Sequence, residues 1–224
     1  MKKTTALIFV LLVLCGCGAT KSLTVEDRSK IHTLAIAPSD VTYEAKKDTI
    51  QLMNKSRTNA MMWGGLVGTL IYESVRDNTP EDVILQLLEK EGMLKNTIAE
   101  AMTYQFQESG LFEKVTSDKQ ASDAHMLIKM PIFQLLISND DQYKLVFRLD
   151  GQLKDNKGNV LWEGWEFLTA FNEQAPTHPF EVYVKDPVIF KQSISIVAQM
   201  IARLYIEGMG GKPAPLNKEL HGKI

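Results

Sequence analysis

The chain has 224 residues, with 25 basic and 27 acidic side chains, four histidines and two cysteines. A chain of this length can bury a sizeable core within one domain. The weak negative balance disfavours a nucleic-acid partner, which requires a basic face, so no such partner is expected.

The N-terminus has the layout of a secretory signal peptide, because Lys2 and Lys3 precede an apolar run over residues 6–14. That run is about half as long as the roughly 20 residues of a membrane-spanning helix. The sequence Leu14-Cys15-Gly16-Cys17 resembles the bacterial lipobox. The resemblance implies cleavage before Cys17, a diacylglyceryl thioether on its sulfur and an acylated amino terminus. The alternative is an ordinary cleaved signal that leaves a soluble periplasmic protein.

Lipidation of Cys17 predicts a protein held at a membrane by its N-terminal lipid, since stable anchoring takes more than one acyl chain. Gly18, and not Asp, follows Cys17. By analogy with Gram-negative sorting, this favours the periplasmic face of the outer membrane. Cys15 leaves with the signal peptide, so the predicted mature chain has no disulfide and no free thiol.

The predicted organisation is a signal peptide over residues 1–16, a polar tether over 17–30, one periplasmic α+β domain over 31–207 and a disordered tail over 208–224. An insertion over residues 43–92 interrupts the domain. The tail contains four glycines and two prolines and has little apolar content, which favours disorder.

The first predicted strand covers residues 31–37, a mostly apolar run that ends at Pro38. Residues 44–59 are polar with scattered apolar positions, and they predict a helix. These two elements open the domain and its insertion.

Residues 60–72 are an uncharged segment with three interpretations. The first is an internal helix docked on the sheet, because the segment is too short to cross a bilayer. The second is a surface for self-association or for a partner. The third is a membrane contact with aromatic residues at its ends. The candidate interaction residues of this segment are Met62, Trp63, Gly64, Gly65, Leu66, Gly68 and Tyr72.

Two helices are predicted next along the chain. Thr79 and Pro80 have the residue types of an N-cap and a first helical position, and the helix that they open extends to residue 91. Gly92 bends or breaks it. Residues 93–109 continue as a helix with one apolar face, ended by Gly110, and a short strand follows over 111–116.

A β-rich block and a closing helix complete the domain. The block contains three predicted strands, over residues 125–137, 143–153 and 160–171. Pro131 marks an edge position or a bulge in the first strand. The second alternates apolar and polar residues, which is typical of an antiparallel strand with one wet face. Trp162 and Trp165 lie on opposite faces of the third. A loop over 172–187 leads to a helix over 188–207.

The pattern as a whole predicts an α+β fold. We expect a mixed sheet of about five strands, formed by an antiparallel meander and one N-terminal strand. Two long helices are expected to pack on one face of this sheet, with the insertion as an added helical segment.

No residue pattern predicts catalysis. The histidines at positions 32, 125, 178 and 221 do not have the spacing of metal ligands. Gly64 to Gly68 does not have the spacing of a dinucleotide fingerprint. We therefore expect no enzyme activity, no metal and no cofactor.

Two short phrases resemble a group of periplasmic domains. Residues 107–115 (QESGLFEKV) are similar to a junction between a helix end and a strand, and residues 155–163 (DNKGNVLWE) are similar to a hairpin of that group. The group comprises the N-terminal domain of TolB, the curli-secretion lipoprotein and the auxiliary lipoproteins of ABC-type lipid transport. The resemblance covers residues 31–37 and 93–207, and it implies non-enzymatic roles in envelope assembly or transport.

Two functions are compatible with these features. The first is an outer-membrane lipoprotein that serves as an interaction or assembly module, with an envelope protein or a second copy of the chain as its partner. The second is a lipid-binding accessory of an envelope transport system, with an apolar cavity between sheet and helices.

Overall fold

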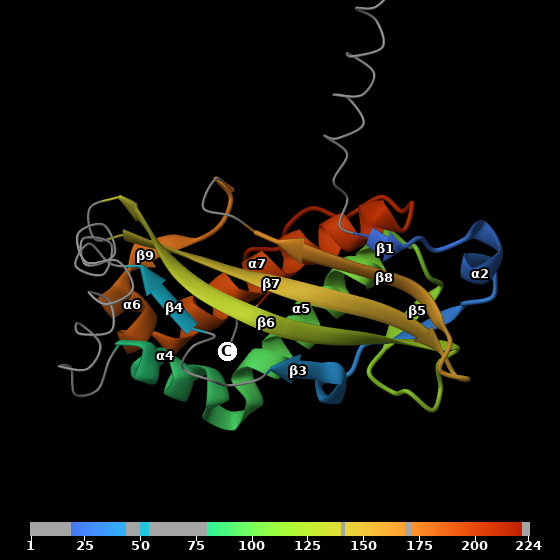
Figure 1. Ribbon diagram of the computed structural model, residues 1–224, viewed down its shortest axis with the longest axis horizontal. Coiled ribbons are helices and arrows are strands. Elements are labelled where there is room, and N and C mark those ends of the chain that lie inside the picture. The colour runs from blue at the N-terminus through green and yellow to red at the C-terminus, as the bar shows by residue number, and fades with distance from the viewer. Residues whose placement is uncertain (1–18, 44–49, 54–79, 140–141, 169–171, 221–224) are drawn as a thin grey trace, which may run out of the picture.

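The computed structural model describes residues 19–43, 50–53, 80–139, 142–168 and 172–220. A layer of helices lies against one face of a twisted sheet (Figure 1). The fold is therefore α+β with a mixed sheet and several helices, as the sequence predicts. Cys17 and the segment over residues 60–72 lie outside the described residues.

Three long antiparallel strands form the centre of the sheet: β6 (Ala124–Asn139), β7 (Gln142–Asp155) and β8 (Val160–Phe167). The expected number of about five strands is wrong, because the described residues form nine strands in one sheet. The other six are short: β1 (Ala19–Lys21), β2 (Thr33–Ala35), β3 (Val41–Tyr43), β4 (Ile50–Met53), β5 (Lys114–Thr116) and β9 (Thr177–Pro179).

Three of the short strands share one edge of β6. β2, β3 and β4 pair with it in parallel and in succession, opposite residues near 124, 128 and 133. β6 has 16 residues, so one short strand cannot cover its length. A single-turn 3-10 helix over Pro38–Asp40 separates β2 from β3. The helix expected over residues 44–59 is wrong at 50–53, which form β4.

The predicted bulge in β6 is present. The register between β6 and β7 shifts between Lys129 and Ile132, on either side of Pro131. Proline cannot donate a hydrogen bond to a neighbouring strand, and the shift accommodates it within a central strand.

The described helices are α2 (Val25–Ser29), α4 (Pro80–Glu89), α5 (Met93–Ser109), α6 (Phe180–Lys185) and α7 (Pro187–Gly208). Three of them match predicted helices within about two residues, and α2 and α6 were not predicted. Gly92 and Gly110 have φ of 67° and 64°, and they separate α5 from its neighbours. The Asp186 carboxylate accepts hydrogen bonds from two backbone N–H groups at the start of α7. The predicted loop over 172–187 is wrong in part, since it contains β9 and α6.

The core lies between the sheet and the pair α5 and α7. Side chains from both layers are fully buried there, among them Phe106, Leu149, Ile194 and Ile201. Trp162 of β8 packs against Tyr205 of α7, with ring centroids 4.9 Å apart. Burial of this kind provides most of the free energy that holds helices on a sheet.

The C-terminal segment differs from the prediction. The sequence predicts a disordered tail over 208–224, but residues 209–220 turn back and pack on α5 and α7. Gln199 of α7 pairs with both backbone groups of Asn217, at 2.8 Å each, and the Gln105 amide of α5 donates to the Pro215 carbonyl. Both glutamines are fully buried. These side-chain amides act together with apolar contacts of the segment, since Met209 and Ala214 are buried and Leu216 and Leu220 pack against the core.

The predicted tether over 17–30 also differs. Of its described residues, 19–21 form β1, which pairs with β8 at the edge of the sheet, and 25–29 form α2. The Thr24 hydroxyl caps α2 by accepting from the Asp27 backbone N–H. Residues 19–21 are thus part of the sheet, and α2 follows them.

Candidate functional site

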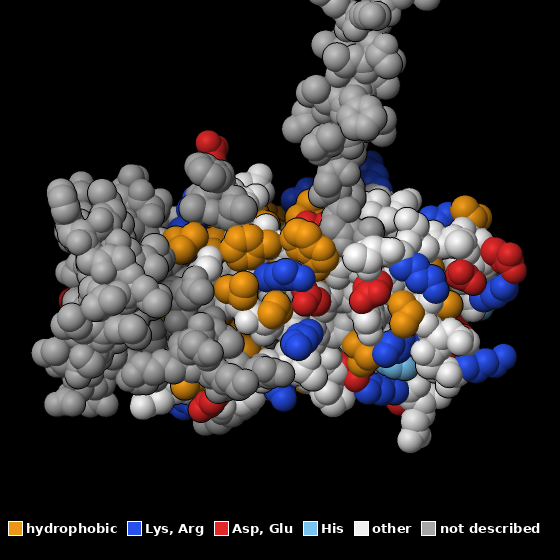
Figure 2. Space-filling view, in the orientation of Figure 1, with side chains coloured by type: hydrophobic (Ala, Val, Ile, Leu, Met, Phe, Trp, Pro, Cys, Tyr) orange, Lys and Arg blue, Asp and Glu red, His pale blue; other side chains and the backbone are white. Residues whose placement is uncertain are grey.

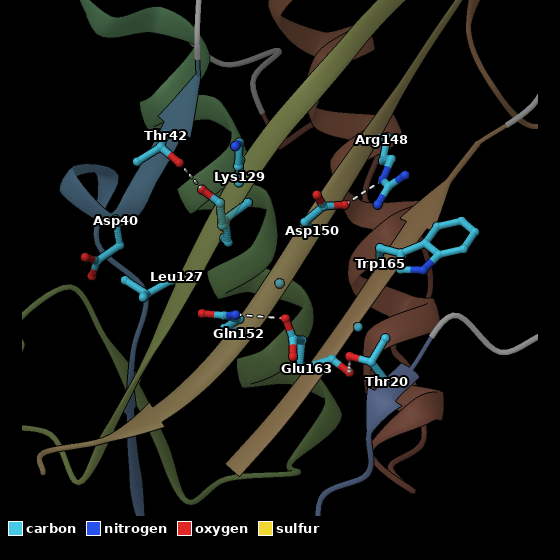
Figure 3. A pocket seen from close by; sticks show the side chains of 13 residues that line it. Thr20, Asp40, Thr42, Leu127, Lys129, Arg148, Asp150, Gln152, Glu163 and Trp165 are labelled. Carbon is cyan, nitrogen blue, oxygen red and sulfur yellow. Dashed lines mark hydrogen bonds and ion pairs between the residues drawn. The ribbon is translucent and has the colours of Figure 1, made fainter. Parts of the chain in front are cut away.

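The candidate site is the face of the sheet opposite the helices. A hollow of about 470 Å³ lies on this face, over β3, β6, β7, β8 and β1. Figure 2 shows charged and apolar side chains interspersed on the described part of this face. Figure 3 shows the hollow from close by, with side chains from all five strands.

The strand register aligns the side chains of the hollow in two rows. Lys129, Asp150 and Trp165 occupy matching positions on β6, β7 and β8. Leu127, Gln152 and Glu163 form the neighbouring row on the same three strands. Residues that face each other across antiparallel strands project from the same face, so both rows point into the hollow.

Arg148, two residues before Asp150 on β7, lies beside the first row and contacts both Asp150 and Trp165. The Arg148 Nε donates to Asp150 Oδ1 at 2.6 Å, and its guanidinium carbon lies 4.6 Å from the centroid of the Trp165 ring. This geometry permits a cation–π interaction. Trp165 is nevertheless 42% exposed, one of three large apolar residues described as exposed. The indole and the guanidinium are therefore both held in place and accessible.

The second row is polar and hydrogen-bonded. The Gln152 amide donates to Glu163 Oε1 at 2.8 Å (Figure 3). Lysine and arginine stand beside aspartate and glutamate in the hollow, so neither sign of charge dominates. A surface of this kind suits a partner that presents both charges together with an apolar group for Trp165.

β1 borders the hollow at the outer edge of β8. Its Ala19 and Lys21 pair with Gly164 and Glu163. The Lys21 ammonium donates to the Val160 carbonyl. The N-terminal end of the described chain therefore lies directly beside the candidate site.

The opposite, inward side of the same strands is closed. Gly151 of β7 pairs with Gly164 of β8, and the ring of Trp162 lies over both glycines. A Cβ atom on Gly164 would lie 2.6 Å from Trp162 Cζ2. Trp162 is 1% exposed. The two faces of β8 thus hold one buried and one exposed tryptophan, as the alternation in the sequence predicts.

Two of the described histidines have local partners. His32 Nδ1 lies 2.9 Å from Glu113 Oε1, and this contact raises the His32 pKa. The His178 ring packs edge-on against Tyr183, and burial lowers the His178 pKa. Among the residues that the structure describes, no three His, Cys, Asp or Glu side chains are grouped as metal ligands would be.

Comparisons with protein-family models, with curated proteins and with solved structures found no match. The described helices include none with the length and apolar character needed to cross a membrane.

The lining of the hollow is absent from the residues that the sequence singles out as a site. The signal was present, since the alternation over 143–153 places Arg148, Asp150 and Gln152 on the wet face of β7. The sequence does not show that β8 brings Glu163 and Trp165 beside them, because that depends on the register between strands.

Proposed function

We propose that the chain is a lipid-anchored protein of the bacterial outer membrane, facing the periplasm, and that its domain is a non-enzymatic interaction module of the cell envelope. The partner is an envelope protein or a second copy of the chain, and the open sheet face is the binding surface. The observation that carries this proposal is the Arg148–Trp165 pair on that face, in which Asp150 holds the half-buried guanidinium and the indole is exposed.

Arginine and tryptophan are the residue types that contribute most to binding at protein interfaces. A cation fixed by Asp150 loses little conformational freedom when a partner binds, which favours affinity. The nearly balanced charge of the chain supports a protein partner over a nucleic acid.

The alternative function, lipid handling, requires an apolar cavity between sheet and helices. In the described part of the chain, side chains such as Phe106, Leu149 and Ile201 fill that space and are fully buried. The hollows formed by residues of α4, α5 and α7 are open to the surface. The open sheet face therefore has the stronger support.

The anchor is tested by the mass and the location of the protein, with Cys17→Ser as the matched variant. We expect the wild-type chain to be heavier than residues 17–224 by a diacylglyceryl group and an acyl group, and to sediment with outer membranes. The variant should lose that mass and become soluble. A wild-type chain without lipid refutes the anchor.

The binding surface is tested by photo-crosslinking in cells. A benzoyl-phenylalanine at Leu127 or Gln152, both in the hollow, should crosslink to the same partner. The same probe at Lys95 or Glu108, which are exposed on α5, serves as the control. Arg148→Glu should remove the crosslinks from the hollow. Crosslinks that are equal at all four positions, or unchanged by Arg148→Glu, contradict the proposed surface.

A further inference from the structure

The short distance between Cys17 and the fold constrains how the domain sits. Ala19 is already paired with Gly164, so only residues 17 and 18 separate the proposed lipid from the sheet. Two residues span at most about 7 Å even when fully extended. The sheet edge formed by β1 and β8 is thus within about 7 Å of the lipidated residue.

The direction of β1 adds a second constraint. Ala19 faces Gly164 and Lys21 faces Glu163, so β1 runs antiparallel to β8. Its N-terminal end therefore lies toward Trp165, the next residue of β8. Thr20 and Trp165 line the same hollow (Figure 3). An exposed tryptophan consequently lies at the end of the sheet edge to which the lipid is tied.

We infer that the lipid-anchored domain stands on the membrane on its β1–β8 edge, with Trp165 at the lipid–water interface. The inference rests on the proposed lipidation of Cys17. Indole rings favour the interface, where an apolar body and a polar N–H are both accommodated.

The order of the strands determines how far the rest of the sheet lies from the membrane in this orientation. β1 and β5 are the two ends of the strand path β1-β8-β7-β6-β2-β5. Five steps of about 4.8 Å place β5 roughly 24 Å from β1. The sheet then rises from the membrane with its open face directed sideways. A partner on that face is accordingly one that lies at the same membrane.

The arrangement is tested with a fluorophore at each end of the sheet. The mature chain has no cysteine other than Cys17, whose thiol the lipid blocks, so a single engineered thiol takes the label. Thr20→Cys reports on β1, and Lys114→Cys on β5 is the matched control. Each full-length lipoprotein carries a nitrobenzoxadiazole label. It is inserted into vesicles of phosphatidylethanolamine and phosphatidylglycerol that contain brominated phosphatidylcholine.

We expect the brominated lipid to quench the label at position 20 several-fold more strongly than the label at position 114. A Gly–Ser linker of about ten residues between Gly18 and Ala19, which spans roughly 17 Å, should reduce the quenching at position 20. Trp165→Ser should reduce it as well, since the indole holds the edge on the lipid.

Mass spectrometry of the same samples distinguishes failure of the proposed anchor from failure of the edge-on arrangement. A chain without lipid refutes the proposed anchor, and the inference falls with it. A lipidated chain that shows equal quenching at both positions, or none at either, overturns the edge-on arrangement while the anchor stands. Quenching at position 20 that neither the linker nor Trp165→Ser reduces overturns it as well.

Discussion

The packing of the C-terminal segment depends on one buried glutamine, and Gln199→Leu tests it. The Gln199 side chain is fully buried in α7. Its amide donates to the Asn217 carbonyl and its oxygen accepts from the Asn217 N–H, both at 2.8 Å. It also accepts from the Gln105 amide at 3.3 Å. The Gln199 amide also donates to the Ser195 hydroxyl at 3.2 Å. Leucine keeps a similar volume but has no polar atoms, so the substitution removes all four hydrogen bonds.

The expected loss follows from these bonds. Each one contributes about 0.5–1.5 kcal/mol net, so the two to Asn217 contribute about 1–3 kcal/mol. Asn217 is only half-buried, and its backbone groups can form hydrogen bonds with water if the segment detaches from α7. The loss in the free energy of unfolding therefore cannot exceed the stability that packing of the whole C-terminal segment contributes. We expect Gln199→Leu to lower the free energy of unfolding by about 2 kcal/mol.

The assay is urea unfolding, followed by circular dichroism on the Cys17→Ser mature chain. Gln86→Leu, at an exposed position on α4, is the control and should change stability by less than about 0.5 kcal/mol. Deletion of residues 213–224 supplies the second arm of a double-mutant cycle. In the shortened chain, Gln199→Leu should have a much smaller effect, because Asn217 is gone and only the longer bonds to Gln105 and Ser195 remain. An equal loss in both backgrounds, or no loss in the full chain, refutes the reasoning.

Three further substitutions test the sheet and its connections. Gly164→Ala should destabilise the fold by about 1–3 kcal/mol and shift the Trp162 emission to the red, because the new methyl group would overlap the indole. Gly208→Ala, with open space around it, is the control and should not reduce stability. Burial raises the pKa of Glu166 above 4.5, so its contribution to stability is present at low pH and is lost as the pH rises through the raised pKa. Glu166→Gln should therefore stabilise the chain at neutral pH but not at acidic pH, and a difference that is constant with pH would contradict this cause. Asp123→Ala removes an acceptor for two backbone N–H groups at the start of β2, at 2.8 and 2.9 Å, and should cost about 2 kcal/mol while Asp123→Asn costs less. Urea titrations of each pair of variants measure these differences.

Elements with a strong period could be predicted from the sequence. The alternation over residues 143–153 predicted β7, and the apolar face between Gly92 and Gly110 predicted α5. The structure confirms both elements. Each of these signals is local, since one face is buried and the glycines adopt a left-handed conformation at the helix ends. The residues alone therefore determine the type and approximate bounds of these elements.

The short strands could not be predicted in the same way. β1, β3 and β9 have three residues each, too few to show a period. They form because a longer strand presents unpaired backbone groups along its edge, and a passing segment satisfies them. That is a property of β6, β7 and β8, not of the short segments themselves.

The packing of the C-terminal segment could not be predicted for a related reason. Its glycines and prolines and its low apolar content favoured disorder, and the sequence does not show that Gln105 and Gln199 bind its backbone. One signal pointed the other way. Residues 193–202 of α7 include apolar side chains on every side of the helix, which is typical of a helix buried all round. A helix of that kind needs a cover on the face away from the sheet, and the chain supplies it.

The two tryptophans of β8 differ in burial, because one faces the core and the other faces the open side of the sheet. The ring of Trp162 fits against the sheet because Gly151 and Gly164 have no side chains beneath it, and it packs against the ring of Tyr205. Trp165, three residues later, has one cation over its ring and is 42% exposed. The inward face of the strand is thus filled by the chain itself. The outward face holds an aromatic side chain in a fixed position without covering it, beside the edge at which the proposed lipid is attached. Because exposed apolar surface at a fixed position favours association, we expect the proposed partner to bind on this face.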